Sequence, residues 1–317
     1  MKQPTTVAVC SRSFSTNTIL RQELLAEFEN VKFNDEGTVL EGFELIDFLR
    51  GYEAAIVGLE VISDSILSKL PYLTVIGKYG VGLDKLDFSA MDRHGVRLGW
   101  TPGVNAQAVA ELTLGLALNI VRRIPEGNQV VANGGWQQIK GRQLSSLTYG
   151  IIGCGNTGKA LVKLLKPFGN RILVHDIENY SEFYETHGIE SVGLAALLRE
   201  SDIISLHIPK NECTLNIIDE TALKMMKSGS YLINTARGGL VDEGAVLRAL
   251  ESGKLTAAAF DVLETEPPDS NVLTNHPSVY VTPHIAGSSE EAILAMGRAA
   301  IRGLTMHHPA SHFLKYC

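Results

Sequence analysis

The chain has 317 residues, of which 45% are hydrophobic and 20% are charged. This length predicts about two domains, each able to bury a hydrophobic core, and the composition excludes a disordered chain. Lysine and arginine number 28 against 35 aspartate and glutamate, and the net charge of −7 with no basic run argues against nucleic acid and anionic membranes as partners.

Short β-branched segments alternate with helical patterns along the first hundred residues. Between these segments, apolar residues recur at the spacing of a helix face. This alternation is typical of a parallel sheet with crossover helices, so the predicted fold class is α/β. Strands are expected at 7–10, 54–58 and 74–77.

A long helical stretch follows the first sheet. It runs from Asn105 to about Ile124, with apolar residues recurring every three to four positions, and Pro125 is expected to end it. A helix of this length suits a connection between two domains.

From Leu147 the alternating pattern starts again. It predicts a second doubly wound parallel sheet, because strand and helix patterns follow one another as before. Strands are expected at 150–153, 171–175, 203–207, 231–234 and 257–260.

The cysteines and the N-terminus bear on cellular location. Cys10, Cys154, Cys213 and Cys317 are scattered and form no C-x-x-C pair, so no metal site or disulfide framework is expected. The N-terminal residues lack the charged and then apolar plan of a signal peptide, and the longest apolar run, 109–121, is interrupted by polar residues. We therefore expect a cytoplasmic protein that does not enter a membrane.

A glycine-rich turn separates the first two strands of the second half. Gly153-Cys-Gly155-Asn-Thr-Gly158 leaves a predicted strand and opens a predicted helix. Gly153 permits the tight turn, Gly155 lets the backbone approach a pyrophosphate, and Gly158 lets helix and strand pack closely. This context predicts a dinucleotide-binding site, and the alternative is a purely structural glycine turn.

Asp176 ends the next strand, at about the distance of 20 residues that is typical of the ribose-binding acid. Its carboxylate can accept hydrogen bonds from both ribose hydroxyls and would repel a 2′-phosphate. The following residues, Ile177-Glu178-Asn179, include no arginine that would offset this repulsion. NAD is therefore favoured over NADP.

Three polar side chains follow later strands, where ligands bind in open α/β sheets. Arg237 stands among small residues, and its planar fork suits a substrate carboxylate. Glu266 and His284 are candidates for a carboxylate-held imidazole, which favours the protonated ring and suits general acid–base catalysis. Taken singly, each of the three also has an ordinary explanation as a solvated or loop residue.

Several ordered motifs together resemble the D-isomer-specific 2-hydroxyacid dehydrogenases. They are the glycine turn, residues 234–242 (NTARGGLVD), 260–262 with 266–267, and 282–287 (TPHIAG). Upstream, 76–87 (IGKYGVGLDKLD) is similar to the substrate loop of that family, and 101–113 (TPGVNAQAVAELT) to the start of its interdomain helix. The resemblance covers nearly the whole chain.

The resemblance implies a molecule of two doubly wound parallel-sheet domains. A Rossmann NAD-binding domain, 99–285, would be inserted into a flavodoxin-like substrate domain formed by 1–98 and 286–317. It also implies a homodimer whose substrate is a small 2-hydroxy or 2-oxo acid.

The resemblance further implies a role for each site residue. Arg237 would bind the carboxylate of the 2-oxo acid, His284 would give or take the hydroxyl proton, and Glu266 would orient and charge His284. Backbone groups near Val81 and Gly82 would complete the carboxylate site. The cofactor contacts carry over to Asn156 and Thr157 at the pyrophosphate, Asp176 at the ribose, His207, Thr214, Thr235 and Ala236 along the pocket, and Asp261 at the carboxamide.

The identity of the substrate stays open between two kinds of acid. Glu60 lies where phosphoglycerate dehydrogenases usually carry arginine for the substrate phosphate, and its charge favours an unphosphorylated acid such as glyoxylate or hydroxypyruvate. Lys78 favours the other reading, because it matches a position that is often basic in those enzymes. A phosphoglycerate dehydrogenase without a regulatory domain is therefore an alternative.

A further alternative is a non-catalytic NAD-sensing regulatory protein, since a fold alone does not prove turnover. The complete set of Arg237, Glu266 and His284 argues against it, because a sensor does not need an acid–base pair.

Overall fold

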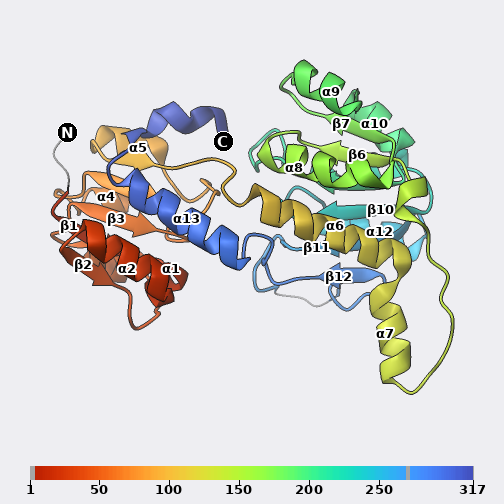
Figure 1. The fold of residues 1–317 in the computed structure, drawn as a ribbon, viewed down its shortest axis with the longest axis horizontal. Helices are drawn as coiled ribbons and strands as arrows, with labels where there is room; N and C mark the ends of the chain where they lie inside the picture. The colour runs from red at the N-terminus through yellow and green to blue at the C-terminus, as the bar shows by residue number, and fades with distance from the viewer. Residues whose placement is uncertain (1–3, 269–271, 317) are drawn as a thin grey trace. The chain divides into compact units, whose positions relative to one another are not determined.

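The computed structural model describes residues 4–268 and 272–316 (Figure 1). The chain divides into two compact units, Met1–Asn105 with Ser289–Cys317, called here the terminal unit, and Ala106–Ser288, called the central unit. The boundaries expected from the sequence lie a few residues before these divisions. Which unit binds substrate and which binds NAD stays a prediction at this point.

The terminal unit is built on a six-stranded sheet of order β13-β5-β4-β3-β1-β2. All neighbouring strands are parallel except the short β13, which is antiparallel to β5. The strands are β1 (Thr6–Val9), β2 (Asn30–Phe33), β3 (Ala54–Val57), β4 (Val75–Lys78), β5 (Arg97–Gly99) and β13 (His308–Pro309). The helices are α1 (Arg12–Thr16), α2 (Thr18–Glu27), α3 (Gly42–Leu49), α4 (Asp64–Leu67), α5 (Phe88–Arg93), α13 (Glu290–Gly303) and the 3₁₀ helix η3 (Ala310–Tyr316).

Alternate residues of these strands supply two separate hydrophobic cores, one on each face of the sheet, as the period of two in a strand requires. Helix α13 lies directly on one face because two strands carry glycine beneath it. A Cβ on Gly77 would lie 2.4 Å from the Ala300 carbonyl oxygen, and one on Gly99 would lie 2.0 Å from that of Gly303. The C-terminal segment is thus an integral part of the terminal unit.

The central unit is built on a seven-stranded parallel sheet of order β12-β11-β10-β9-β6-β7-β8. The strands are β6 (Tyr149–Ile152), β7 (Ile172–His175), β8 (Glu190–Ser191), β9 (Ile203–Leu206), β10 (Ser230–Asn234), β11 (Leu255–Phe260) and β12 (Val279–Val281). The helices are α6 (Ala106–Arg122), α7 (Ile124–Ala132), η1 (Leu144–Ser146), α8 (Asn156–Leu165), η2 (Lys166–Phe168), α9 (Ser181–His187), α10 (Leu194–Glu200), α11 (Glu220–Met225) and α12 (Glu243–Glu251).

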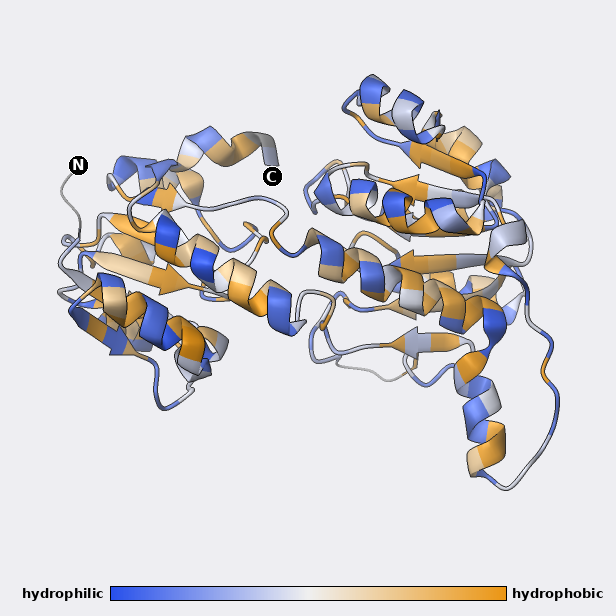
Figure 2. Cartoon of the chain, viewed as in Figure 1, coloured by the Kyte–Doolittle hydropathy of each residue, from blue (hydrophilic) through white to orange (hydrophobic). Residues whose placement is uncertain are grey.

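The strand order of the central unit fixes where a ligand binds. The chain runs outward from β6 through β7 to β8 and then returns to β9 on the other side of β6. Such a reversal opens a crevice at the carboxyl ends of the strands on either side of it. In Figure 2 the strands are largely hydrophobic and the covering helices are banded, as expected for helices with one buried face. The predicted α/β class with two parallel sheets is confirmed.

The region around Pro125 differs from the expectation. Helix α6 ends at Arg122, and Arg123 adopts the left-handed conformation with φ 53°. Pro125 then stands in the first turn of α7, where its missing N–H and fixed φ are tolerated, so it begins a second helix and does not end the first.

Within the described ranges, every helix is too short or too polar to cross a membrane.

Candidate active site

The glycine turn joins β6 to α8 at the reversal of strand order. Gly153 has φ 96°, and a Cβ there would lie 2.5 Å from the His207 carbonyl oxygen. A Cβ on Gly158 would lie 2.1 Å from the Gly153 carbonyl oxygen. Both glycines are therefore required by packing inside the unit. Gly155 differs, because a Cβ there would meet nothing within 4 Å.

This open space beside Gly155 lies at the N-terminus of α8. No side chain caps the helix, whose first residues are Asn156 and Thr157. The N–H groups of a first helical turn have no partner in the helix and attract anions. An open approach to uncapped N–H groups fits a pyrophosphate, so the turn passes a structural test for a dinucleotide.

Asp176 follows β7 and lies beside the glycine turn. Its Oδ2 accepts a hydrogen bond from the Cys154 N–H at 2.5 Å, and its Oδ1 accepts one from the Glu178 N–H at 2.8 Å. The carboxylate is half-buried and held by backbone on two sides. A fixed anion at this position suits ribose hydroxyls and disfavours a further phosphate.

His207 follows β9, on the other side of the reversal. Its Nε2 lies 2.9 Å from the Ser205 hydroxyl, whereas Nδ1 is buried and has no hydrogen-bond partner among the described residues. Burial lowers the pKa of His207 to about 3, so the ring is neutral. A buried polar atom without a partner is unusual in a folded protein and suits a site that a ligand completes.

The other expected cofactor contacts in this unit already have internal partners. The Thr235 hydroxyl lies 2.7 Å from that of Thr113 on α6. The Thr214 hydroxyl donates to the Pro209 carbonyl and accepts from the Asn211 N–H, both at 2.8 Å. These threonines shape the loops after β9 and β10, and their hydroxyl oxygens keep capacity for one further hydrogen bond.

Arg237 stands in the loop after β10, which the buried Asn234 shapes. The Asn234 side chain donates to the Arg237 carbonyl oxygen at 2.8 Å and accepts from the Ala236 N–H at 3.1 Å. The Arg237 guanidinium donates to the Ala236 carbonyl oxygen at 2.7 Å and is half-buried. Asn234 therefore sets the backbone that presents Arg237.

The loop of Arg237 packs against the loop that follows β11. A Cβ on Gly238 would lie 1.8 Å from the Leu263 carbonyl oxygen, so only glycine allows this approach. In the second loop, Glu266 Oε1 accepts a hydrogen bond from the Leu263 N–H at 3.0 Å. The loop of Arg237 and the side chain of Glu266 thus both contact the backbone of Leu263.

His284 completes the group. Its Nδ1 lies 2.7 Å from Glu266 Oε2, and the two side chains are 47% and 39% exposed. The carboxylate accepts a hydrogen bond from Nδ1, which fixes the ring orientation and leaves Nε2 as the ring atom that can exchange a proton with a ligand. The structure therefore brings Arg237, Glu266 and His284 together through the loops after β10, β11 and β12.

Asp261 has a role that the sequence did not reveal. It is 1% exposed, and its carboxylate accepts hydrogen bonds from the Thr282 hydroxyl at 2.5 Å and from the N–H groups of Ile285 and Ala286 at 2.8 Å. Its carbonyl oxygen accepts the His284 N–H at 2.9 Å. Asp261 thus holds the His284 loop, and an acid directly after a buried strand was the only signal for this.

The predicted substrate residues of the terminal unit lie at the end of β4 and in the loops after β3 and β4. Lys78 is 5% exposed, and its ammonium donates to the carbonyl oxygens of Gly58 at 2.6 Å and Tyr79 at 3.1 Å. Glu60 Oε2 accepts the Gly58 N–H at 2.6 Å. The Lys78 ammonium and the Glu60 carboxylate are therefore both hydrogen-bonded to the backbone of Gly58. Val81 and Gly82 lie half-buried in the loop after β4.

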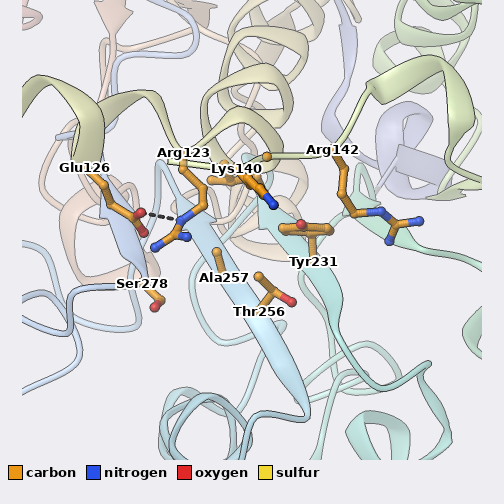
Figure 3. A pocket seen from close by; sticks show the side chains of 10 residues that line it. Arg123, Glu126, Lys140, Arg142, Tyr231, Thr256, Ala257 and Ser278 are labelled. Atoms are coloured by element: carbon orange, nitrogen blue, oxygen red, sulfur yellow. Dashed lines mark hydrogen bonds and ion pairs between the residues drawn. The ribbon is translucent and has the colours of Figure 1, made fainter. Parts of the chain in front are cut away.

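A cavity of about 500 Å³ lies elsewhere in the central unit (Figure 3). Arg123, Lys140 and Arg142 line it together with Tyr231 and Thr256, which stand near the starts of β10 and β11. The amino ends of parallel strands lie at the opposite edge of a sheet from the carboxyl ends. This cavity is therefore separate from the glycine turn and from His284, and no sequence motif marked it.

The site at the carboxyl edge combines a turn that fits a dinucleotide with an imidazole–carboxylate pair. Proton exchange next to a bound dinucleotide is the chemistry of a dehydrogenase. The fold and the site thus define a dinucleotide-dependent oxidoreductase.

Comparisons with known proteins agree with this class. The model of the D-isomer specific 2-hydroxyacid dehydrogenase NAD binding domain matches residues 114–286. A glyoxylate reductase from Thermofilum pendens is 37% identical over 270 residues, which are 82% of this chain and 80% of that protein. A D-3-phosphoglycerate dehydrogenase from Methanocaldococcus jannaschii is 36% identical over 283 residues, which are 88% of this chain but 54% of that protein.

Among solved structures, a D-lactate dehydrogenase from Aquifex aeolicus, complexed with NAD and lactic acid, matches with a TM-score of 0.83 and 27% identity, over 95% of this chain and 94% of that one. The chain belongs to the D-isomer specific 2-hydroxyacid dehydrogenase family. It is an NAD-dependent oxidoreductase that acts on the CH–OH group of 2-hydroxy acids.

Proposed function

We propose that this enzyme interconverts a small, unphosphorylated 2-hydroxy acid, of R configuration where C2 is chiral, and its 2-oxo acid, with glyoxylate or hydroxypyruvate as the oxo acid. The observation that carries the chemistry is the 2.7 Å contact between His284 and Glu266. The loop of Glu266 packs against the loop of Arg237. When bound, NAD supplies or accepts the hydride. The remaining work is done by the side chains of the chain itself.

The three side chains divide this work. Arg237 binds the substrate carboxylate, because its planar fork matches two carboxylate oxygens. His284 gives a proton from Nε2 to the substrate oxygen during reduction and takes it back during oxidation. Glu266 accepts a hydrogen bond from Nδ1 and so holds the tautomer and orientation of the ring. Backbone groups of Val81 and Gly82 are proposed as further contacts of the substrate.

The central unit is proposed to be the NAD-binding domain and the terminal unit the substrate domain. Asn156 and Thr157 would hold the pyrophosphate, with Gly153, Gly155 and Gly158 shaping the turn, and Asp176 would hold the ribose. His207, Thr214, Thr235 and Ala236 would line the pocket, and Asp261 would meet the carboxamide, since each carboxylate oxygen accepts more than one hydrogen bond.

The internal hydrogen bonds of Lys78 support an unphosphorylated substrate. The ammonium of Lys78, the residue that could bind a phosphate, is buried and donates to two backbone carbonyls. Phosphohydroxypyruvate is the substrate to test against.

A homodimer in the cytoplasm is part of the proposal. In α7 no residue is buried, and in the segment after it Trp136 is 89% exposed. Ile124 and Val131 of α7 are also exposed, and exposed apolar side chains mark interaction surfaces.

The free cysteines bear on the compartment. Cys10 and Cys154 are buried free thiols, which suits a reducing compartment.

The test is NADH oxidation followed with glyoxylate, hydroxypyruvate, pyruvate and phosphohydroxypyruvate. We expect turnover, with kcat/KM highest for glyoxylate or hydroxypyruvate. NADH binding without turnover of any acid would instead support a sensor, and a preference for phosphohydroxypyruvate would support a phosphoglycerate dehydrogenase.

A further inference from the structure

Two consecutive peptide groups, Val262–Leu263 and Leu263–Glu264, contact the loops that carry Glu266 and Arg237. The Leu263 N–H donates to Glu266 Oε1 at 3.0 Å. The Leu263 carbonyl oxygen lies against Gly238, next to Arg237. The first of these peptides therefore holds the Glu266 carboxylate, and the second lies against the loop of Arg237.

A residue outside the proposed site holds the second of these peptides, Leu263–Glu264. Glu243 Oε1 accepts the Glu264 N–H at 2.7 Å, across 21 positions of sequence. Burial raises the pKa of Glu243, followed by the nearby charge of Glu264, and the hydrogen bond from the Glu264 N–H opposes both effects. The contact thus keeps a half-buried carboxylate in place.

Helix α12 explains why Glu243 can act as an anchor. Glu243 is the first residue of the helix, which buries Ala245, Val246, Ala249 and Leu250 in the central core. The helix is already capped by Asp242, whose Oδ1 accepts the Ala245 N–H at 2.9 Å. Capping therefore does not account for the contact that Glu243 makes with the loop.

We propose that Glu243 is a positioning residue for the reaction, which fixes the Leu263–Glu264 peptide to α12 and so aligns Glu266 with His284. This inference rests on the proposed function, because it gives Glu243 a role through Glu266. Glu243 acts as a hydrogen-bond acceptor of defined length, and the chemistry needs its geometry more than its charge.

The first variant removes the acceptor. Glu243→Ala is expected to lower kcat roughly 10-fold to 100-fold, because small misplacements of catalytic groups carry losses of this size. The KM of the oxo acid changes less than kcat, and the Kd of NADH, measured by fluorescence, stays unchanged. A general structural role would affect all three and the thermal midpoint together.

Two conservative variants separate geometry from charge. Glu243→Gln keeps an oxygen of the right reach and is expected to retain wild-type kcat within about threefold. Glu243→Asp keeps the charge but shortens the side chain by one methylene, and is expected to lose kcat as the alanine variant does. If the alanine variant fails to fold, this pair still decides the question.

Glu220 offers a matched control. It is the first residue of α11, follows the capping residue Asp219 as Glu243 follows Asp242, and pairs with exposed Lys224 and Arg248. Glu220→Ala removes an equivalent first-turn acid and is expected to leave kcat unchanged.

Wild-type kcat in folded Glu243→Ala or Glu243→Asp would overturn the inference, as would a loss in Glu243→Gln equal to that in the alanine variant. His284→Asn identifies which claim has failed. If it is inactive while Glu243→Ala has wild-type kcat, only the role of Glu243 is wrong. If His284→Asn is fully active, the proposed function is wrong as well.

Discussion

The two units place charged residues at the carboxyl ends of parallel strands in opposite ways. In the central unit, backbone and buried side chains fix the loops, and His284 and Glu266 remain 47% and 39% exposed. In the terminal unit, Lys78 is 5% exposed and, like Glu60, is bonded to the backbone of Gly58. The fold thus leaves the imidazole–carboxylate pair accessible to a ligand, whereas the ammonium of Lys78 is occupied by internal hydrogen bonds.

The largest expected effect comes from the exposed imidazole. His284→Asn should cut kcat by roughly 100-fold to 10,000-fold, the usual contribution of a positioned acid–base group. NADH affinity should stay unchanged, because the glycine turn is untouched. Steady-state kinetics with a fluorescence titration of NADH measures both, and near wild-type turnover would remove His284 from the mechanism.

Arg237→Lys tests the second accessible group. An ammonium cannot reproduce two parallel hydrogen bonds to a carboxylate, so kcat/KM for the oxo acid should fall roughly tenfold to a hundredfold. The Kd of NADH should barely move. Equal losses in substrate and cofactor affinity would mark Arg237 as a structural residue.

Asp176→Ala concerns the cofactor edge of the same unit. Removal of the carboxylate takes away the ribose acceptor and the charge that repels a 2′-phosphate, so the preference for NADH over NADPH should narrow. The ratio of kcat/KM for the two cofactors measures this. A wild-type enzyme that used both cofactors equally would contradict the role given to Asp176.

The smallest effect concerns stability. His207 has a folded-state pKa of about 3, against an ordinary value of 6.5, so between these values the unfolded chain binds a proton that the folded protein does not. The contribution of His207 to the free energy of unfolding is complete above about pH 6.5 and is lost as the pH falls towards 3. Urea unfolding of wild type and His207→Gln measures this. Between pH 6.5 and 4, the free energy of unfolding should fall less steeply with pH in the variant than in wild type. The same pH dependence in both proteins would contradict this assignment.

Local features of the fold and site could be predicted, and long-range ones could not. The residues of the glycine turn are neighbours in the sequence, so the motif can be recognised there. Strands such as β6 are buried on both faces and therefore form unbroken apolar runs. By contrast, β2 and β12 are edge strands, and half-exposed edges leave a weaker pattern. The anchoring by Asp261 and Glu243 depends on loops that meet only in the folded sheet.

The comparison between the two units depends most directly on Lys78. The decisive measurement is the ratio of kcat/KM for phosphohydroxypyruvate to that for hydroxypyruvate, in wild type and in Lys78→Met. If Lys78 is bonded internally and does not bind a phosphate, wild type prefers hydroxypyruvate and the substitution lowers both values by the same factor, leaving the ratio unchanged. A wild-type preference for phosphohydroxypyruvate that is lost in Lys78→Met would contradict the account and assign the substrate phosphate to Lys78.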